Sequence, residues 1–342
     1  MIFKQIFDKN TSTYTYIIGS RKGSEALIID PVLENVDQYI NILNTLKLKL
    51  VKVIDTHIHA DHVTGASKLK KETSCTIIMG EQSPSEVVEI KIKDQELIKI
   101  EELELKAIYT PGHTSDSYSF LMKDRVFSGD ALLINGTGRT DFQNGSPLDS
   151  YNSIFKKLLK LPDDTLVYPA HDYKGDSVST IIEEKKFNPR LQVNSVDEYI
   201  EIMNSLNLPD PKLMDIAVPS NLKLGIDFNK QKVNNGIEPE EFKKLLAEKN
   251  SIVIDLREQS EIDKNGKITN SIIIPFPTIS NYLNKNKDKL YNKKILFYCA
   301  IGQRSTLAVQ ISKSYKYNNS FHLIGGLQNW KKKAFHYDNL YN

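Results

Sequence analysis

The chain of 342 residues has only two cysteines, Cys75 and Cys299, which lie far apart in different surroundings. This argues against a secreted fold built on disulfides and favours a reducing compartment. The first eight residues are too few and too polar for a signal peptide. No apolar run approaches the about 20 residues that a membrane-spanning helix needs. We therefore expect a cytoplasmic protein without a membrane partner.

The sequence also lacks an excess of charge of either sign. Its 45 Lys and Arg residues nearly balance its 43 Asp and Glu residues, which gives a net charge of +2. Nothing in this balance suggests a nucleic-acid partner, and the many lysines are better explained as a solvated surface. A hydrophobic content of 40% is ordinary for a globular protein. At roughly 150 residues per domain, the length predicts two domains.

The first part of the chain reads as a series of strands with helices between them. A hairpin is predicted from two apolar runs, Tyr14–Ile18 and Ala26–Ile29, that flank the turn residues 19–23. Helical spacing marks residues 36–48, 151–159 and 178–187. Further short apolar runs predict strands at residues 50–54, 76–79, 103–109, 118–122 and 126–128.

The composition changes after residue 221, where a polar stretch without periodicity begins. We predict a first domain over residues 1–225, a linker over residues 226–235 and a second domain over residues 236–342. In the second domain, strands alternate with helices, which predicts a small parallel-sheet α/β domain. Its expected helices cover residues 238–249 and 305–314, and its expected strands cover residues 251–254, 271–274, 295–298 and 322–324.

Five of the seven histidines lie in three short motifs of the first part. Imidazole and carboxylate are the ligands that hold divalent transition metals. Isolated histidines are usually satisfied polar residues in loops, but this many in Gly- and Pro-marked loops indicate one or two metal ions. Asp61 and His62 could complete a second metal site or orient the ligands of the first. The three motifs are HIHADH with His57, His59, Asp61 and His62, TPGH with His113, and PAHDY with His171; an acid, Asp130, lies between them in SGD.

These motifs resemble the metallo-β-lactamase superfamily, which implies an αββα sandwich fold. Many members of that superfamily are dinuclear zinc hydrolases, such as glyoxalase II. All seven ligand positions of the superfamily are filled here, so the ligand set alone leaves the metal open. The flanking segments resemble the persulfide dioxygenase family over about residues 2–225, in particular GDALLI, GRTDFQ, YPAHDY, NPR and AVPSN at residues 129–134, 138–143, 168–173, 188–190 and 217–221.

The resemblance to persulfide dioxygenases implies one iron(II) ion per first domain, held by His57, His113 and Asp130. Such a triad leaves positions open for substrate sulfur and dioxygen. The other four positions would then orient ligands and water; they are His59, Asp61, His62 and His171. Candidates for holding a thiol carrier, which could be glutathione, coenzyme A or bacillithiol, are Arg139, Tyr173 and Arg190.

Cys299 directly follows an apolar strand and precedes a helix. Backbone N–H groups in such a loop, together with the helix dipole, depress the pKa of a thiol and make its thiolate a nucleophile. Gly302 lets the backbone turn tightly, and Arg304 could pair with an anionic sulfur substrate. A buried structural cysteine is the alternative. Cys75 has no activating neighbour and is expected to be structural.

The surroundings of Cys299 resemble the rhodanese family over about residues 236–335. The matching segments are VIDLRE, GKITNS, CxxGxRS and GGLQNW, which begin at residues 253, 266, 299 and 325. The resemblance implies that Cys299 carries a persulfide and that Asp255 and Arg257 are structural. Ala300 replaces the family's basic residue after the cysteine, so the sulfur donor stays open.

Together the resemblances imply a fused persulfide dioxygenase and sulfurtransferase that acts in sulfide detoxification. The first domain would oxidise a thiol persulfide with O2 to sulfite and free thiol. The second would form or use thiosulfate through Cys299. A dinuclear zinc thioester hydrolase with a sulfur-relay domain is the main alternative, and a non-catalytic persulfide sensor is a third. The sequence leaves open the carrier thiol, the direction of sulfur transfer and the oligomeric state, for which the resemblance suggests a homodimer.

Overall fold

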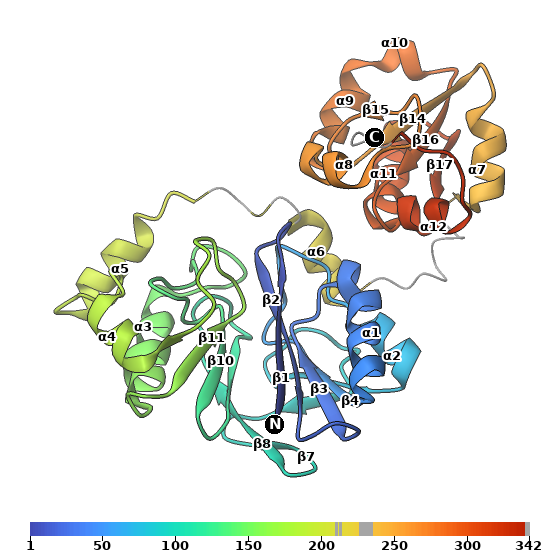
Figure 1. Ribbon diagram of the computed structural model, residues 1–342. Helices are drawn as coiled ribbons and strands as arrows, with labels where there is room; N and C mark the ends of the chain where they lie inside the picture. The colour runs from blue at the N-terminus through green and yellow to red at the C-terminus, as the bar shows by residue number, and fades with distance from the viewer. Residues whose placement is uncertain (209–210, 212–213, 226–234, 339–342) are drawn as a thin grey trace. The chain divides into compact units, whose positions relative to one another are not determined.

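The computed structural model describes residues 1–208, 211, 214–225 and 235–338. The chain divides into two compact units, Met1–Gly225 and Ile226–Asn342 (Figure 1). Of the predicted linker, only Asn235 belongs to the described residues. Within the described part of the chain, no helix combines the length and the apolar character needed to span a bilayer.

The first unit contains two six-stranded sheets. One has the strand order β1-β2-β3-β4-β5-β6. β2 and β3 pair antiparallel, which confirms the predicted hairpin. Helices α1 and α2 lie on the outer side of this sheet (Figure 1). The elements are β1 Ile2–Asp8, β2 Thr13–Gly19, β3 Glu25–Ile29, α1 Val36–Leu46, β4 Lys49–Ile54, α2 Ala66–Thr73, β5 Thr76–Gly80 and β6 Ile90–Ile92.

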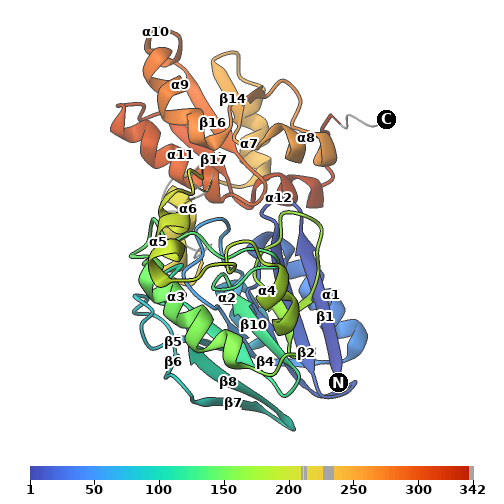
Figure 2. The same cartoon turned by 90° about the vertical axis from the view of Figure 1, so that its left-hand side faces the viewer.

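The other sheet has the order β12-β11-β10-β9-β8-β7. Helices α3, α4 and α5 cover its outer side (Figure 2). A second apolar cluster, which includes Val126, Ile154, Ile181 and Tyr199, packs these helices onto the sheet. The elements are β7 Leu97–Ile100, β8 Leu103–Tyr109, β9 Tyr118–Leu121, β10 Arg125–Gly129, α3 Pro147–Lys156, β11 Leu166–Pro169, β12 Ser179–Thr180, α4 Ile181–Phe187, α5 Val196–Asn204 and α6 Met214–Asn221.

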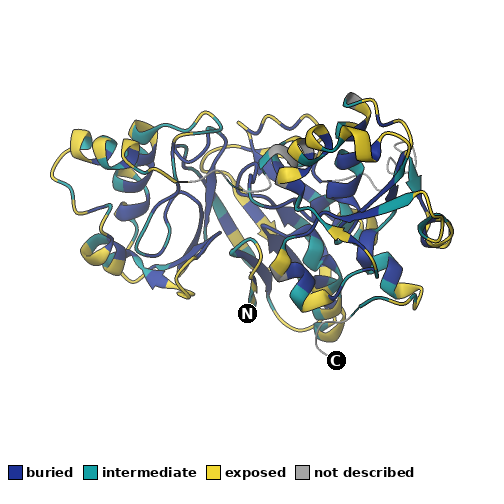
Figure 3. Ribbon diagram, turned by 90° about the horizontal axis from the view of Figure 1, so that it is seen from above, coloured by how far each residue is buried: buried dark blue, intermediate teal, exposed yellow. Residues whose placement is uncertain are grey.

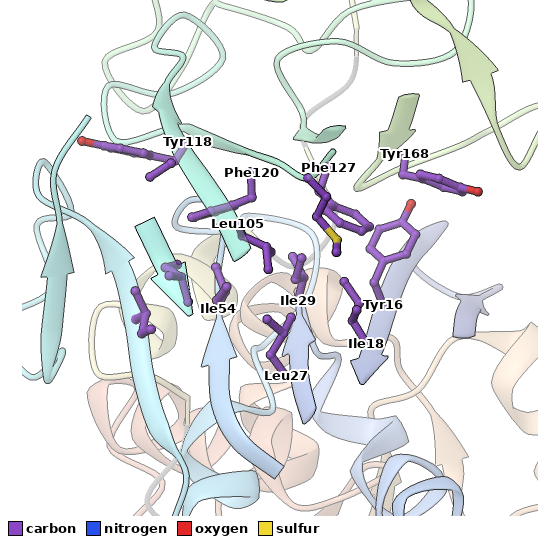
Figure 4. Close-up of a cluster of buried hydrophobic side chains, with 14 of the residues drawn as sticks. Tyr16, Ile18, Leu27, Ile29, Ile54, Leu105, Tyr118, Phe120, Phe127 and Tyr168 are labelled. Atoms are coloured by element: carbon purple, nitrogen blue, oxygen red, sulfur yellow. The ribbon is translucent and has the colours of Figure 1, made fainter. Parts of the chain in front are cut away.

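The main core of the first unit lies between the two sheets (Figure 4). Successive side chains of a strand point to opposite faces of its sheet, so every second residue of each strand points inward. Figure 3 shows the consequence, with buried strands inside and exposed residues on the outer faces of the helices. The layers confirm the predicted αββα sandwich. The facing side chains include Tyr16, Ile18, Leu27, Ile29 and Ile54 from one sheet and Leu105, Tyr118, Phe120, Phe127 and Tyr168 from the other.

Two predicted helices begin at different residues from those expected. The helix predicted over residues 178–187 begins at Ile181, because Ser179 and Thr180 pair with β11 as strand β12. The Thr180 side chain accepts a hydrogen bond from the Glu183 N–H and so caps the helix. The helix predicted over residues 151–159 begins at Pro147, after the N-cap Ser146.

The second unit has one five-stranded parallel sheet in the order β13-β17-β16-β14-β15. This confirms the predicted small parallel α/β domain. An apolar cluster that includes Phe242, Leu296 and Trp330 forms its core. The elements are β13 Gly236–Ile237, α7 Pro239–Leu246, β14 Ser251–Asp255, α8 Gln259–Asn265, β15 Ile272–Ile273, α9 Ile279–Lys285, α10 Lys287–Leu290, β16 Lys294–Tyr298, α11 Gln303–Ser314, β17 Ser320–Leu323 and α12 Gly326–Lys332.

Candidate metal centre and cysteine loop

The candidate ligands of the first unit all follow the carboxyl ends of strands. The HIHADH motif comes after β4, His113 after β8, Asp130 after β10 and His171 after β11. A rigid sheet can direct several loop residues to one point in this way. All of these histidines and Asp130 are buried, whereas Asp61 is partly exposed.

The structure places six of the seven residues in groups that could each hold a metal ion. Potential ligand atoms of His57, His113 and Asp130 all lie within 4.8 Å of one another. His59, Asp61 and His62 form a second group of the same kind. A third group, within the described residues, combines His59 with two acids that the sequence analysis did not select, Asp30 and Asp55.

Hydrogen bonds select the ring nitrogens of His57 and His113 that can bind a metal. The Nδ1 of His113 lies 2.8 Å from the Arg139 carbonyl oxygen, which only accepts, so Nδ1 carries the proton. The Thr56 hydroxyl donates to Asp30 and is left to accept from Nδ1 of His57 at 3.0 Å. Both rings therefore keep a lone pair on Nε2. The Nε2 of His113 lies 3.5 Å from Oδ2 of Asp130.

His171 lies between two carboxylates. Its Nδ1 is 2.7 Å from Oδ1 of Asp130, and its Nε2 is 2.8 Å from Oδ2 of Asp61. Burial alone would lower the pKa of His171, but the two carboxylates outweigh it and raise the pKa well above the usual value. Burial likewise opposes the charge of Asp130, yet His171 holds the pKa of that carboxyl below its ordinary range. The ion pair orients the Asp130 carboxylate.

Two histidines of the hexapeptide have one ring nitrogen that is hydrogen-bonded and one that has no hydrogen-bond partner among the described residues. Nε2 of His59 lies 2.9 Å from Asp30, and Nδ1 of His62 lies 2.9 Å from Asp61. Among the described residues, no group hydrogen-bonds the buried Nδ1 of His59 or the buried Nε2 of His62. Such orphaned groups cost about 1–3 kcal/mol each. A metal ion would remove this cost, so the cluster fits a metal.

Asp30 also sets the charge of His59. Burial lowers the pKa of His59, but Asp30 outweighs burial and raises the pKa to about 9. The metal-free ring is therefore cationic at neutral pH. A metal ion that bound Nδ1 of His59 would have to displace a proton.

In the second unit, Cys299 lies in the short loop between β16 and α11. The Gly302 N–H donates to the Cys299 Sγ at 3.2 Å, and Gly302 has a left-handed φ of +95°. In the first turn of α12, the Leu327 and Gln328 N–H groups donate to the carbonyl oxygens of Cys299 and Ala300 at 2.8 and 3.0 Å. These bonds tie the backbone of the cysteine loop to α12.

Arg304, which is predicted to pair with an anionic sulfur substrate, binds an acidic side chain of its own unit. Its two terminal nitrogens bind the Glu261 carboxylate at 2.7 and 2.6 Å, and both side chains are buried. Asp255 and Arg257 form a second buried pair at the end of β14, where Arg257 also donates to the Gly266 carbonyl. Both cysteines are free, and burial raises the pKa of Cys75.

Comparisons with known proteins agree with this architecture. The family model described as metallo-beta-lactamase superfamily matches residues 9–171, and the one described as rhodanese-like domain matches residues 238–333. The mouse protein named persulfide dioxygenase ETHE1, mitochondrial, is 41% identical over 229 residues, which cover 66% of this chain and 89% of the mouse protein. The chain belongs to the persulfide dioxygenase family. It carries in addition a C-terminal rhodanese-like domain.

Two further similarities bear on the site. The crystal structure of ETHE1 from Myxococcus xanthus superposes with a TM-score of 0.65 at 47% identity, covering 66% of this chain and all of that chain. A hydroxyacylglutathione hydrolase of Dictyostelium discoideum is 32% identical over 194 residues, which cover 53% of this chain and 71% of the hydrolase. The persulfide dioxygenases are thus the more similar of the two groups.

Three residues of the first unit are predicted to hold the substrate, and each has different neighbours in the structure. Arg139 is bidentate with Asp141, at 2.6 and 2.7 Å, and lies over the Phe142 ring. Tyr173 is 70% exposed, and its ring stacks on that of His171. Arg190 donates to the backbone and side chain of Thr137, and no carboxylate of the described residues pairs with it.

The residues that brace these ligands were not predicted from the sequence. Asp30 accepts hydrogen bonds from the Thr56 N–H, the Thr56 hydroxyl and His59. The available signal was an acid directly after a buried strand, as at Asp130. Glu261, by contrast, lies in a polar segment with no local signal. Gln143 ends the GRTDFQ segment, but nothing there indicates its partner. Only the fold brings these two residues to Arg304 and to the metal-ligand loop.

Proposed function

We propose that the first unit is an iron(II) persulfide dioxygenase whose ligands are His57, His113 and Asp130. The observation that carries the proposal is the pattern of free lone pairs. His57 and His113 each keep Nε2 available, and Asp130 keeps Oδ2 close to His113, while both nitrogens of His171 bind carboxylates. Two imidazoles and one carboxylate are the donor set of non-haem iron(II) oxygenases.

The chain's own residues hold these ligands in place. The Arg139 carbonyl and the Thr56 hydroxyl fix the rings of His113 and His57, and His171 fixes the carboxylate of Asp130. Iron(II) bound there would supply open positions at which the terminal sulfur of a persulfide meets dioxygen. The overall reaction consumes a thiol persulfide, O2 and water and releases sulfite and the free thiol.

An anionic thiol carrier fits the cations near the site. Burial lowers the pKa of Arg190, and the absence of a paired carboxylate in the described part of the chain leaves its charge uncompensated. A carboxylate of glutathione, or an anionic group of coenzyme A or bacillithiol, would supply the missing partner. Arg139 already has Asp141, so we assign it, with Tyr173, a lesser share of substrate binding.

For the second unit, we propose sulfane-sulfur transfer through a persulfide on Cys299, by which persulfide and sulfite give thiosulfate and thiol, or the reverse. The Gly302 N–H donates to the Cys299 sulfur and the start of α11 lies beside it, so this loop offers hydrogen-bond donors to the sulfur that Cys299 would carry. Both units would then act on the same sulfur compounds in sulfide detoxification.

A dinuclear zinc thioester hydrolase is the second candidate function. It is favoured by the unpartnered nitrogens of His59 and His62, which a second ion could bind. The similarity to the Dictyostelium hydroxyacylglutathione hydrolase points in the same direction.

Metal analysis together with an oxygen electrode separates the two functions. The expected result is about one iron per chain and oxygen uptake with glutathione, coenzyme A or bacillithiol persulfide, with sulfite as product. Two zinc ions per chain with thioester hydrolysis, and no oxygen uptake after iron loading, would contradict the dioxygenase. Sulfite that never forms from any persulfide under air, with no hydrolysis, would favour a persulfide sensor.

The remaining proposals concern the organisation of the chain. We propose functional domains over residues 1–225 and 236–342 with a linker over residues 226–235. The two free cysteines support a reducing compartment, for which we propose the cytoplasm, although the mammalian relatives carry the word mitochondrial in their names. A homodimer is proposed from the family resemblance and can be checked by light scattering.

A further inference from the structure

We infer that Gln143 is a positioning residue for the metal ligands, which it holds through the peptide between His57 and His59. Its Nε2 donates to the Ile58 carbonyl oxygen at 2.9 Å. Because a carbonyl oxygen only accepts, this contact also fixes which end of the carboxamide faces Ile58. Ile58 is buried, so its backbone has little access to water as an alternative partner.

The opposite side of the same residue is held by a different loop. The Ile58 N–H donates to Oδ2 of Asp116 at 3.0 Å, and Asp116 follows His113 by three residues. Gln143 itself belongs to the segment after Asp130. The two polar groups of Ile58 therefore connect the His57 loop to the loops that carry the other two ligands. A shift of either partner would move the rings of His57 and His59 relative to His113 and Asp130.

Gln143 makes this contact from a backbone conformation that is unfavourable for a residue other than glycine, and its own amide oxygen lacks a donor among the described residues. Its φ is +50°, in the left-handed region that non-glycine residues seldom adopt, and Asn144 follows with φ +56°. Within the described residues, nothing donates to the buried Oε1 of Gln143. Strain and an orphaned acceptor persist where a contact serves the site rather than local stability. The contact served here is the one to Ile58.

Two glycine variants provide a matched test, because each relieves one left-handed residue and only one removes the carboxamide. Gln143→Gly deletes the bond to Ile58, whereas Asn144→Gly deletes an exposed side chain. The inference rests on the proposed metal centre but not on the reaction. The readouts are therefore the Co(II) dissociation constant from chelator competition, the Co(II) absorption spectrum and the melting temperature of the metal-free protein.

The expected result is a loss of about tenfold in Co(II) affinity and an altered spectrum for Gln143→Gly, as for other residues that orient metal ligands. Asn144→Gly should match the wild type within twofold, and the metal-free melting temperatures should agree. Equal affinity and spectra in the two variants would overturn the inference. So would a lower melting temperature of metal-free Gln143→Gly with an unchanged spectrum. Absence of persulfide oxidation in the wild type would contradict the proposed function alone.

Discussion

The buried pair between Glu261 and Arg304 gives a quantitative prediction for the rhodanese-like domain. Glu261→Gln removes the negative charge and leaves the Arg304 guanidinium buried with a neutral partner. Removing one member of a buried ion pair costs about 3–5 kcal/mol. Both side chains here are about nine-tenths buried, so solvent screening reduces this little. Because one hydrogen bond can form to the new amide oxygen, we expect the lower end, about 3 kcal/mol.

The melting temperature of the second unit should fall accordingly by about 10–20 °C. Trp330 is the single tryptophan of the chain and lies buried in that unit, so its fluorescence reports the unfolding of the unit directly. Glu248→Gln is the matched control. Its partner Lys294 is 2.6 Å away, but the pair is exposed and contributes at most about 0.5–1 kcal/mol.

The same variant tests the role that the sequence suggested for Arg304. If Arg304 braces the domain, Glu261→Gln lowers stability and does not improve the KM for thiosulfate. A melting temperature equal to that of Glu248→Gln, combined with a lower KM for thiosulfate, would refute the bracing role. Arg304 would then be a substrate ligand that Glu261 holds back.

Three further predictions concern the charges and ligands of both units. Asp130→Ala should abolish iron binding and oxygen uptake but leave thiosulfate sulfurtransferase turnover. Cys299→Ser should abolish sulfurtransferase turnover but leave iron binding and oxygen uptake. Metal analysis and the two turnover assays check this, and a Cys299→Ser variant without oxygen uptake would contradict it. Arg190→Gln should raise the KM for an anionic thiol persulfide about 10–100-fold at similar kcat, since a hydrogen bond to a charged group contributes about 1.5–3 kcal/mol. An unchanged KM would exclude Arg190 from substrate binding. Burial opposes the charge of Glu261, but Arg304 outweighs burial and holds the pKa of Glu261 below the usual value. The ion pair therefore stabilises the folded unit fully above a pH of about 4.3, and this contribution is lost as the pH falls through the lower pKa of the folded state. The difference in melting temperature between wild type and Glu261→Gln should shrink in acid, and a constant difference would argue against the ion pair.

The strands and helices that the sequence predicted well are those with long periodic or apolar patterns. The hairpin of β2 and β3, the strand β16 before Cys299 and the helix α11 are examples. Short edge strands such as β6 and β12 carry two or three residues of signal and were not predicted. The start of α4 was misplaced because an apolar Val178 outweighed the capping residue Thr180 in the periodic pattern.

The candidate ligands could be found from spacing because they lie within a hexapeptide and three short motifs. The contacts that orient them could not. Asp116 reaches Ile58 from 58 positions away, Gln143 from 85 and His171 reaches Asp61 from 110. Nothing in the local sequence marks these contacts, because they exist only after the two sheets have packed together.

The number of metal ions depends on hydrogen bonds more than on the ligand count. Seven ligand-type residues are present, but His171 has no free nitrogen, since Asp130 and Asp61 each hold one. A second ion that bound His171 would have to break one of these bonds. Asp61, which would be the acidic ligand of that ion, already accepts a hydrogen bond from His62. The triad of His57, His113 and Asp130 requires no such rearrangement, because both Nε2 lone pairs and one carboxylate oxygen are already free. The nitrogens of His59 and His62 that lack hydrogen bonds in the described part of the chain favour a second ion, but the bonds of His171 that such an ion would break argue more strongly against it. One ion is the arrangement that disturbs the fewest hydrogen bonds.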